Sequence, residues 1–383
     1  MSKVGVIERV TQNRIINLFK NQLGYHFLGN WKERENKSIE TNLLKPFLQK
    51  QGYSEKLIKR GLRVLDQSSA MGDGRSLYDA NKDVYRILRY GIKAKESVGE
   101  QNQTLWLINW NEPEKNNFAI AEEVTVKGEN TKRPDLVLYI NGIAIGVIEL
   151  KRSTVGLTEG IRQNLINQRK DFIRPFFTTM QLVMAGNDSQ GLRYGTIETI
   201  EKYYLEWKEE GGIGEYKLDQ HLSLIFEKHR LLELLHDFIV FDSGIKKVCR
   251  QNQYFGIKKA QDFISNSKGG IIWHTQGSGK SLSMVWLAKW IRENVKDSRV
   301  LIITDRTELD EQIEKVFRGV DEDIYRTSSG ADLVQKLNRS DQWLICSLIH
   351  KFGGSNNDEA SNEDVDKFLA EIKKNIFTTL ERL

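Results

Sequence analysis

Cysteine is scarce in this sequence, and its scarcity excludes two classes of protein. Among 383 residues there are two cysteines, Cys249 and Cys346, which lie far apart in the chain. They offer neither the pairs of a disulfide-rich secreted fold nor the clustered ligands of a structural zinc site. We therefore expect both thiols to be reduced and structural.

Long apolar runs and a strong net charge are also lacking. The opening residues, MSKVGVIERVTQNR, do not contain the apolar stretch of a signal peptide, and no window approaches the roughly 18 apolar residues needed to cross a membrane. The 57 Lys and Arg residues exceed the 52 Asp and Glu residues by a formal charge of +5, which permits a nucleic-acid partner without requiring one. We expect a soluble cytoplasmic protein with no membrane partner.

The length favours two domains, because single cores usually stop growing before 383 residues. Helical periodicity dominates the first hundred residues, and patterns typical of strands begin at Thr104. An acidic, Gly-rich stretch then precedes a predicted boundary near residue 230. The prediction is one domain over 1–230 and a second over 231–383, both of α/β type.

In the second domain, the apolar run GGIIW, a Gly-rich loop, an amphipathic helix and the run RVLIITD predict a strand, loop, helix and strand in succession. That order is the setting of a phosphate-binding loop. Gly277 and Gly279 allow backbone amides to surround phosphate oxygens, Lys280 reaches the β- and γ-phosphates, and Ser281 binds magnesium. The predicted ATP contacts are Thr275, Gln276, Gly277, Ser278, Gly279, Lys280 and Ser281.

The loop departs from the usual pattern at His274, where Gly is expected; the alternative is a Gly/Ser-rich turn before a helix. Hydrolysis also needs an acidic residue at the end of a neighbouring strand. Asp358-Glu359 is a poor candidate, because no apolar strand precedes it. We expect the chain to bind ATP but to hydrolyse it poorly.

A second constellation joins carboxylates to a lysine. Asp135 begins one apolar run, Glu149 and Lys151 end the next, and Asn141-Gly142 between the runs is a strong hairpin signal. Residues two apart on a strand share a face, and the hairpin brings Asp135 alongside. Two carboxylates make an oxygen site suited to Mg²⁺, so Asp135 and Glu149 are the predicted metal ligands. The alternative is a surface ion pair at a strand end.

Two further residues could complete this site. Glu8 on the first helix could add an acidic group, and Gln163 on the helix after Lys151 could contact DNA or orient the site. The alternative for each is a solvated helix face. The predicted catalytic residues are Asp135, Glu149, Lys151, Glu8 and Gln163.

With both motifs, the chain resembles the restriction and DNA-translocating (R) subunit of type I restriction-modification enzymes. The resemblance covers essentially the whole chain, and in that family His commonly precedes the phosphate-binding loop. It rests on QLGY at 22–25, RPDLVLYINGIAIGVIELKRS at 133–153, RYGTIET at 193–199, LLELLHDFIVFD at 231–242 and IIWHTQGSGKSLSMVWLAK at 271–289.

The resemblance implies a PD-(D/E)xK restriction-endonuclease-like domain followed by an incomplete RecA-like P-loop domain. It implies that Gln253 recognises adenine and that Thr304-Asp305-Arg306 is a motor motif. The family's Gln-x-x-x-Tyr element would begin at Gln163, but this chain has Asn167 in place of Tyr. Because family members continue well beyond this length, we expect a truncated member that displays the nuclease fold without translocating.

The resulting hypothesis is a type I site-specific deoxyribonuclease subunit that uses Mg²⁺ and ATP and acts on double-stranded DNA, with separate modification and specificity subunits as partners. The basic residues Arg86, Arg89, Lys93 and Lys95 are expected to contact the DNA backbone. One rival is a DNA-repair helicase-nuclease. A second is a DNA- or subunit-binding scaffold with an inactive nuclease site, and a third is an ATPase unrelated to nucleic acid.

Overall fold

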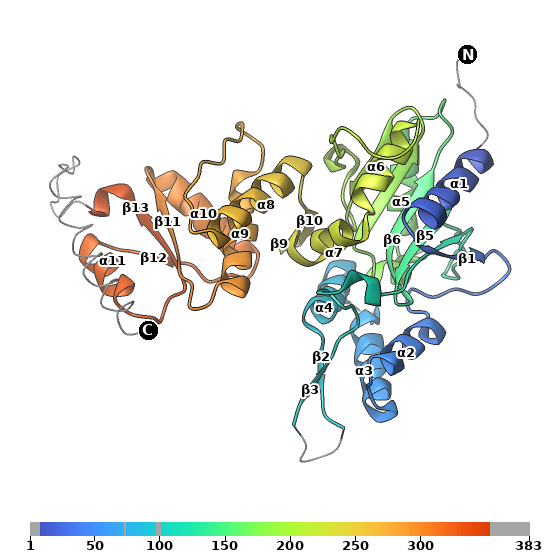
Figure 1. Cartoon of the computed structure of the whole chain (residues 1–383), viewed down its shortest axis with the longest axis horizontal. Helices are drawn as coiled ribbons and strands as arrows, with labels where there is room; N and C mark the ends of the chain where they lie inside the picture. Colours follow the sequence, from blue (N-terminus) through green and yellow to red (C-terminus); the bar gives the residue numbers. More distant parts are fainter. Residues whose placement is uncertain (1–7, 73, 97–100, 353–383) are drawn as a thin grey trace. The chain divides into compact units, whose positions relative to one another are not determined.

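The computed structural model describes residues 8–72, 74–96 and 101–352, and the chain divides into two units, Met1–Gln251 and Asn252–Leu383 (Figure 1). Both units are of mixed α/β type, as predicted. Within the described residues, no helix is long and apolar enough to cross a membrane.

A six-stranded mixed sheet forms the centre of unit 1, in the order β1-β4-β5-β6-β7-β8. β1 runs parallel to β4 and β6 runs parallel to β7, whereas the other neighbours are antiparallel. Every residue of β4 to β7 is buried, as expected for apolar runs in a sheet covered on both faces. The strands are β1 (His26–Asn30), β4 (Phe118–Glu122), β5 (Leu136–Ile140), β6 (Ile143–Leu150), β7 (Leu182–Asn187) and β8 (Gly191–Gly195).

The hairpin predicted from Asn141-Gly142 is confirmed. β5 and β6 pair antiparallel, with Ile140 opposite Ile143. Asn141 and Gly142 have φ values of 54° and 85°, the left-handed conformation that a two-residue turn of this kind requires at both positions. The turn therefore fixes the register that sets Asp135 against the end of β6.

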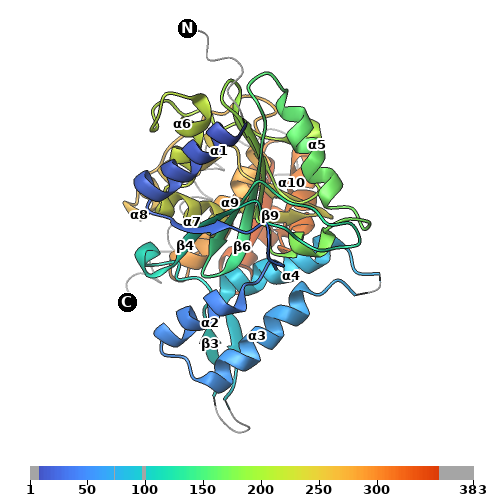
Figure 2. The same cartoon turned by 90° about the vertical axis from the view of Figure 1, so that its right-hand side faces the viewer.

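Helices cover both faces of this sheet. In Figure 2, α1 (Glu8–Asn17) and α6 (Lys217–Ile225) lie on one side of the strands and α5 (Leu157–Asn167) lies on the other. Gly160 allows α5 to approach closely, because a Cβ atom there would lie 3.0 Å from Cβ of Ala185 and 3.4 Å from Cγ of Lys151. α5 consequently rests directly on the strand ends that carry the candidate site.

The helical character predicted for the first hundred residues is confirmed. Ser54 and Ser76 cap α3 and α4 by accepting hydrogen bonds from backbone N–H groups three residues later. The elements are α2 (Thr41–Lys50), α3 (Glu55–Ser69), α4 (Leu77–Tyr90) and the paired strands β2 (Ile92–Ala94) and β3 (Gln103–Leu105), with the short helices η1 (Leu18–Gln22), η2 (Pro113–Lys115), η3 (Arg174–Thr178) and η4 (Glu201–Tyr203) elsewhere in the unit.

Unit 1 continues past the boundary predicted near residue 230. It includes α7 (Lys228–Asp237) and the antiparallel strands β9 (Ile239–Asp242) and β10 (Ile245–Val248). These elements are tied to the rest of the unit, since Tyr194 Oη donates to the Cys249 carbonyl at 3.0 Å and Lys246 Nζ donates to Asn81 Oδ1 at 2.7 Å. Cys249 and Cys346 are both buried and free, as predicted.

Unit 2 contains a three-stranded parallel sheet in the order β11-β13-β12. Its strands are β11 (Val300–Thr304), β12 (Tyr325–Arg326) and β13 (Leu344–Leu348), and its helices are α8 (Gln251–Ser265), α9 (Lys280–Asn294), α10 (Thr307–Gly319), α11 (Gly330–Leu337) and the short η5 (Ile349–Phe352).

The strand predicted for GGIIW is wrong for the described structure. Residues 269–275 have no strand conformation, and Ile271 and Trp273 are 89% and 90% exposed. A strand needs a hydrogen-bonded neighbour, and within the described residues β11, β12 and β13 pair with one another and not with this segment. The loop and helix that follow it form as predicted.

Candidate functional sites

Glu149 and Lys151 share one face at the end of β6, as predicted. The Glu149 side chain is fully buried, and its Oε2 lies 3.9 Å from Nζ of Lys151, whose side chain is 15% exposed. A carboxylate removed from water requires charged or hydrogen-bonding partners. The ammonium group of Lys151 supplies one such charge, beside Glu149 at the end of the strand.

Asp135 reaches the same place from the other arm of the hairpin. It immediately precedes β5, and its Oδ2 accepts a 2.7 Å hydrogen bond from the backbone N–H of Leu150. Leu150 lies between Glu149 and Lys151, so the three predicted site residues are brought together. The hydrogen bond also fastens the start of β5 to the end of β6.

Two amides of α5 are directed at the Glu149 carboxylate. Gln163 Nε2 donates to Oε2 at 2.7 Å, and Asn167 Nδ2 approaches Oε1 at 3.5 Å. Residues four apart share a helix face, so the side chains of Gln163 and Asn167 can each reach one oxygen of the Glu149 carboxylate. Gln163 therefore fixes one oxygen of the Glu149 carboxylate, and its role in the site stays a prediction.

Gln12 and the adjacent acids Glu122 and Glu123 were not identified from the sequence. Gln12 Nε2 lies 3.3 Å from the carbonyl of Asp135 and 3.3 Å from Oε2 of Glu122. Backbone N–H of Glu123 donates to the same Asp135 carbonyl at 2.9 Å. The sequence does contain a signal that could have identified Glu122 and Glu123, since they are two consecutive acids at the end of the apolar run FAIA.

Helix α1 is fixed over this end of the sheet by Arg14. Its guanidinium pairs with Asp188, which follows β7, and with Asp219 of α6 at 2.9 Å, while Thr11 Oγ1 donates to Asp188 at 3.1 Å. Burial raises the pKa of the Asp219 carboxyl, and Arg14 acts in the opposite direction. Glu8 is the first residue of α1, but its side chain lies outside the described residues.

The residues at this site suit a hard divalent cation. Asp135 and Glu149 supply carboxylate oxygens, and Oδ1 of the buried Asn167 is an amide oxygen with no hydrogen-bond partner. Mg²⁺ and Mn²⁺ prefer oxygen ligands of these kinds. The donor set thus fits the metal that the sequence pattern implies.

The phosphate-binding loop has the backbone that its glycines predict. Gly277 and Gly279 have φ values of 76° and 87°, and Gly279 is the N-cap of α9. Lys280 Nζ donates to the carbonyls of His274 and Thr275, each at 3.2 Å. Ser278 Oγ also donates to the Thr275 carbonyl, at 2.7 Å, so the loop closes on itself at the start of the helix.

Gln253 packs against this loop, and His274, at the start of the loop, packs on α8. Gln253 Nε2 donates to the Gly279 carbonyl at 2.9 Å, so the residue assigned to adenine lies beside the loop. The His274 ring packs on α8 at Gly256, where a Cβ atom would lie 3.1 Å away. Of the predicted motor motif, Thr304 ends β11 and is buried, whereas Asp305 is exposed. Asp358-Glu359 lies outside the described residues.

One predicted DNA contact is wrong. Arg89 is only 5% exposed, and its guanidinium lies 3.8 Å from Oδ1 of Asp237, because it belongs to the buried face of α4. Arg86, Lys93 and Lys95 are exposed and stay predictions.

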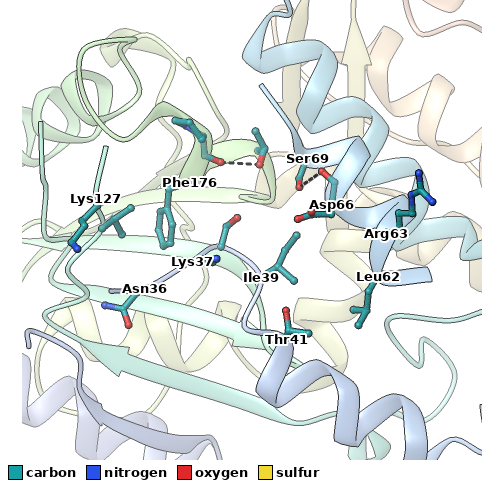
Figure 3. A pocket seen from close by; sticks show the side chains of 14 residues that line it. Asn36, Lys37, Ile39, Thr41, Leu62, Arg63, Asp66, Ser69, Lys127 and Phe176 are labelled. Atoms are coloured by element: carbon teal, nitrogen blue, oxygen red, sulfur yellow. Dashed lines mark hydrogen bonds between the residues drawn. The ribbon is translucent and has the colours of Figure 1, made fainter. Parts of the chain in front are cut away.

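A hollow of about 570 Å³ in unit 1 contains none of the predicted site residues. Ile39 and Phe176 line it, and Figure 3 shows the Arg63 side chain directed away from its centre. Of the acidic residues, Asp66 lines it, but no second carboxylate does. It lacks the paired carboxylates of the hairpin cluster, so the hairpin is the better candidate for a metal site.

Curated relatives of this chain are endonuclease subunits by name. A Methanocaldococcus jannaschii protein provisionally named type I restriction enzyme MjaIXP endonuclease subunit is 28% identical over 317 residues, 73% of this chain and 30% of the relative. The type I restriction enzyme HindI endonuclease subunit of Haemophilus influenzae is 27% identical over 298 residues, 70% of this chain and 27% of the relative. The chain thus spans about three tenths of the length of these relatives.

Two protein families match successive parts of the chain. Residues 252–379 match the family described as SWI2/SNF2 ATPase, and this matched span contains the phosphate-binding loop. Residues 7–202 match the family described as type I restriction enzyme R protein N terminus, a span that holds the hairpin, Gln163 and Asn167. On this match over half of its length, the chain belongs to the type I restriction enzyme R protein N-terminus family.

Proposed function

We propose that unit 1 is a metal-dependent nuclease of the PD-(D/E)xK type, which cleaves double-stranded DNA as part of a type I restriction endonuclease subunit. The observation that carries the proposal is the convergence of Asp135, Glu149 and Lys151 at one end of the β5–β6 hairpin, in a chain of this family. The expected metal is Mg²⁺.

The protein groups have separable tasks in this reaction. Gln163 holds Oε2 of Glu149, and the Asp135 link to Leu150 keeps the second carboxylate at the same strand end. A bound Mg²⁺ would supply Lewis acidity toward a phosphodiester and lower the pKa of water. Lys151 places an ammonium beside Glu149, where it can offset negative charge on a phosphate or hold a proton near the attacking water.

Unit 2 is proposed to bind ATP through the loop from Thr275 to Ser281, as the first part of a RecA-like motor. Its match to an ATPase family and the left-handed glycines before α9 support this role. ATP bound there would drive DNA translocation, and separate modification and specificity subunits would select the DNA. The relatives are named as endonuclease subunits of type I restriction enzymes, which supports a role in a multi-subunit assembly.

Cleavage of duplex DNA by wild type and Lys151→Ala tests the nuclease assignment. We expect metal-dependent cutting by wild type and a loss of about 100-fold or more in the variant, with DNA affinity unchanged. Arg152→Ala is the matched control, since Arg152 is the exposed neighbour of Lys151. Equal cleavage by wild type and Lys151→Ala would contradict the proposal, and metal-independent binding without cutting would favour a scaffold.

A further inference from the structure

Asn167 is the asparagine of α5 whose amide faces Glu149, and one of its two polar atoms has no hydrogen-bond partner. The residue is 1% exposed, and its Nδ2 approaches Glu149 Oε1 at 3.5 Å while its Oδ1 accepts no hydrogen bond. An unsatisfied buried oxygen costs roughly 1–3 kcal/mol, so a residue that retains one needs an explanation.

The two α5 amides hold Glu149 unequally. Gln163 makes a short 2.7 Å hydrogen bond to Oε2, whereas the 3.5 Å separation at Oε1 is at the outer limit of a hydrogen bond. The α5 amides therefore hold Oε1 less tightly than Oε2. The Asn167 amide is the group that faces Oε1.

A turn of this amide about its Cβ–Cγ bond exchanges Nδ2 and Oδ1. The oxygen then faces Oε1 at a comparable separation, close to the roughly 3 Å between adjacent ligands of an octahedral ion with bonds of about 2.1 Å. Without a cation, the amide nitrogen is preferred next to the carboxylate because it donates. With a cation, the oxygen is preferred.

We propose that Asn167 is an oxygen ligand of the divalent cation at the nuclease centre, together with Glu149 and Asp135. The inference rests on the proposed function, since it concerns the metal of that site. It gives position 167, where this chain departs from the family's tyrosine, a direct role in metal binding.

Titration calorimetry of Mn²⁺ into the full chain, alone and with duplex DNA present, tests the ligand. Asn167→Leu removes both polar atoms at similar volume and should weaken Mn²⁺ binding about tenfold or more. Unchanged affinity in Asn167→Leu would overturn the inference.

A change of ligand chemistry separates coordination from support. Asn167→Cys introduces a soft thiolate, so its affinity for Cd²⁺ relative to Mn²⁺ should rise about tenfold or more over wild type. The matched control is Asn164→Cys, one turn earlier on α5, where the asparagine is equally buried but donates to the Met184 carbonyl instead. Its Cd²⁺ to Mn²⁺ ratio should stay at the wild-type value. Equal ratios in the two cysteine variants would contradict direct ligation.

The outcomes distinguish this inference from the function on which it rests. Mn²⁺ binding that depends on Asp135 but is indifferent to position 167 would reject Asn167 alone. Absence of Mn²⁺ binding by wild type, both with and without DNA, would reject the metal-dependent nuclease as well. Unfolding midpoints of wild type and of every variant titrated show whether each is folded at the titration temperature.

Discussion

Gln163 donates a 2.7 Å hydrogen bond to Glu149, and so connects the helix that follows the β5–β6 hairpin to the carboxylate at the end of that hairpin. The two residues are 14 positions apart in the chain. Their contact depends on the close approach of α5 to the sheet, which Gly160 permits. Orientation of the buried carboxylate and packing of the helix are thus coupled.

Replacing Gln163 by leucine should weaken metal binding without unfolding the protein. A hydrogen bond to a charged group contributes about 1.5–3 kcal/mol, and loss of a residue that orients a ligand usually lowers metal affinity about 10- to 100-fold. Calorimetric titration of Mn²⁺ measures this change. Arg162→Ala, at an exposed neighbouring position paired with Glu201, should leave the affinity unaltered; a similar loss there would argue against a specific role for Gln163.

Replacing Gly160 by alanine should disturb the same site through packing. The added Cβ atom would lie 3.0 Å from Ala185 and 3.6 Å from Cβ of Glu149, so α5 must move away from β6 and β7. Crowding costs about 1–3 kcal/mol, partly offset by about 1 kcal/mol of helix propensity. We expect a small loss of stability in urea denaturation and a clear loss of Mn²⁺ affinity.

Gly156→Ala provides the comparison for this variant. Its Cβ atom would meet only Oγ1 of Thr158, at an ordinary contact distance of 3.4 Å. Mn²⁺ affinity should stay at the wild-type level in Gly156→Ala. Unaltered affinity in Gly160→Ala would show that the α5 contact does not set the geometry of Glu149.

Lys246 makes the stability of unit 1 depend on pH in the alkaline range. Burial lowers the pKa of Lys246 well below its usual value, although Nζ donates to Asn81 and Gln181. The unfolded chain therefore binds more protons than the folded chain between the lowered pKa and about 10.5. The free energy of unfolding should rise with pH through that window, relative to a Lys246→Met variant.

Chemical denaturation of wild type and Lys246→Met at several alkaline pH values measures this difference, and subtraction cancels the other titrating groups. Lys247→Met is the adjacent control, because Lys247 is paired with Asp242 and is partly exposed. Relative to wild type, Lys246→Met should lose this pH-dependent increase in the free energy of unfolding, and Lys247→Met should keep it. A difference between wild type and Lys246→Met that does not vary with pH would contradict this prediction.

Replacing Lys280 by alanine should weaken ATP binding by unit 2. Loss of a charge-assisted hydrogen bond costs about 1.5–3 kcal/mol, which corresponds to about 10- to 100-fold in affinity. Fluorescence titration with a labelled ATP analogue measures the change. Lys289→Ala, on the same helix but ion-paired with Glu322, should bind as wild type does. Undiminished binding by Lys280→Ala would contradict the assignment of the loop.

The hairpin could be predicted from the sequence because its determinants are local. Asn141-Gly142 specifies the turn, and the two-residue spacing of Glu149 and Lys151 specifies the shared face. Gln12 and Arg14 could not be found in this way. Their partners, Glu122, Asp188 and Asp219, lie 110 to 205 residues away and approach only when α1 packs on the sheet.

Unit 2 shows where prediction from local sequence fails. The run GGIIW has the composition of a buried strand, but composition does not specify a neighbour, and within the described residues Ile271 and Trp273 are exposed. The glycines of the loop were predictable, since their left-handed φ values follow from local chemistry. The interpretation of Arg89 failed for a similar reason, because its charge does not reveal that it lies on the buried face of α4 and pairs with Asp237.

Mn²⁺ titration of wild type against Asp135→Asn tests the nuclease centre most directly. Asparagine keeps an acceptor for the Leu150 N–H and removes the charge, so the hairpin is preserved while the metal site is weakened. The account predicts Mn²⁺ binding to wild type and a loss of about tenfold or more in Asp135→Asn. Equal binding by the two proteins would place the metal elsewhere and contradict the assignment of the hairpin as a nuclease centre.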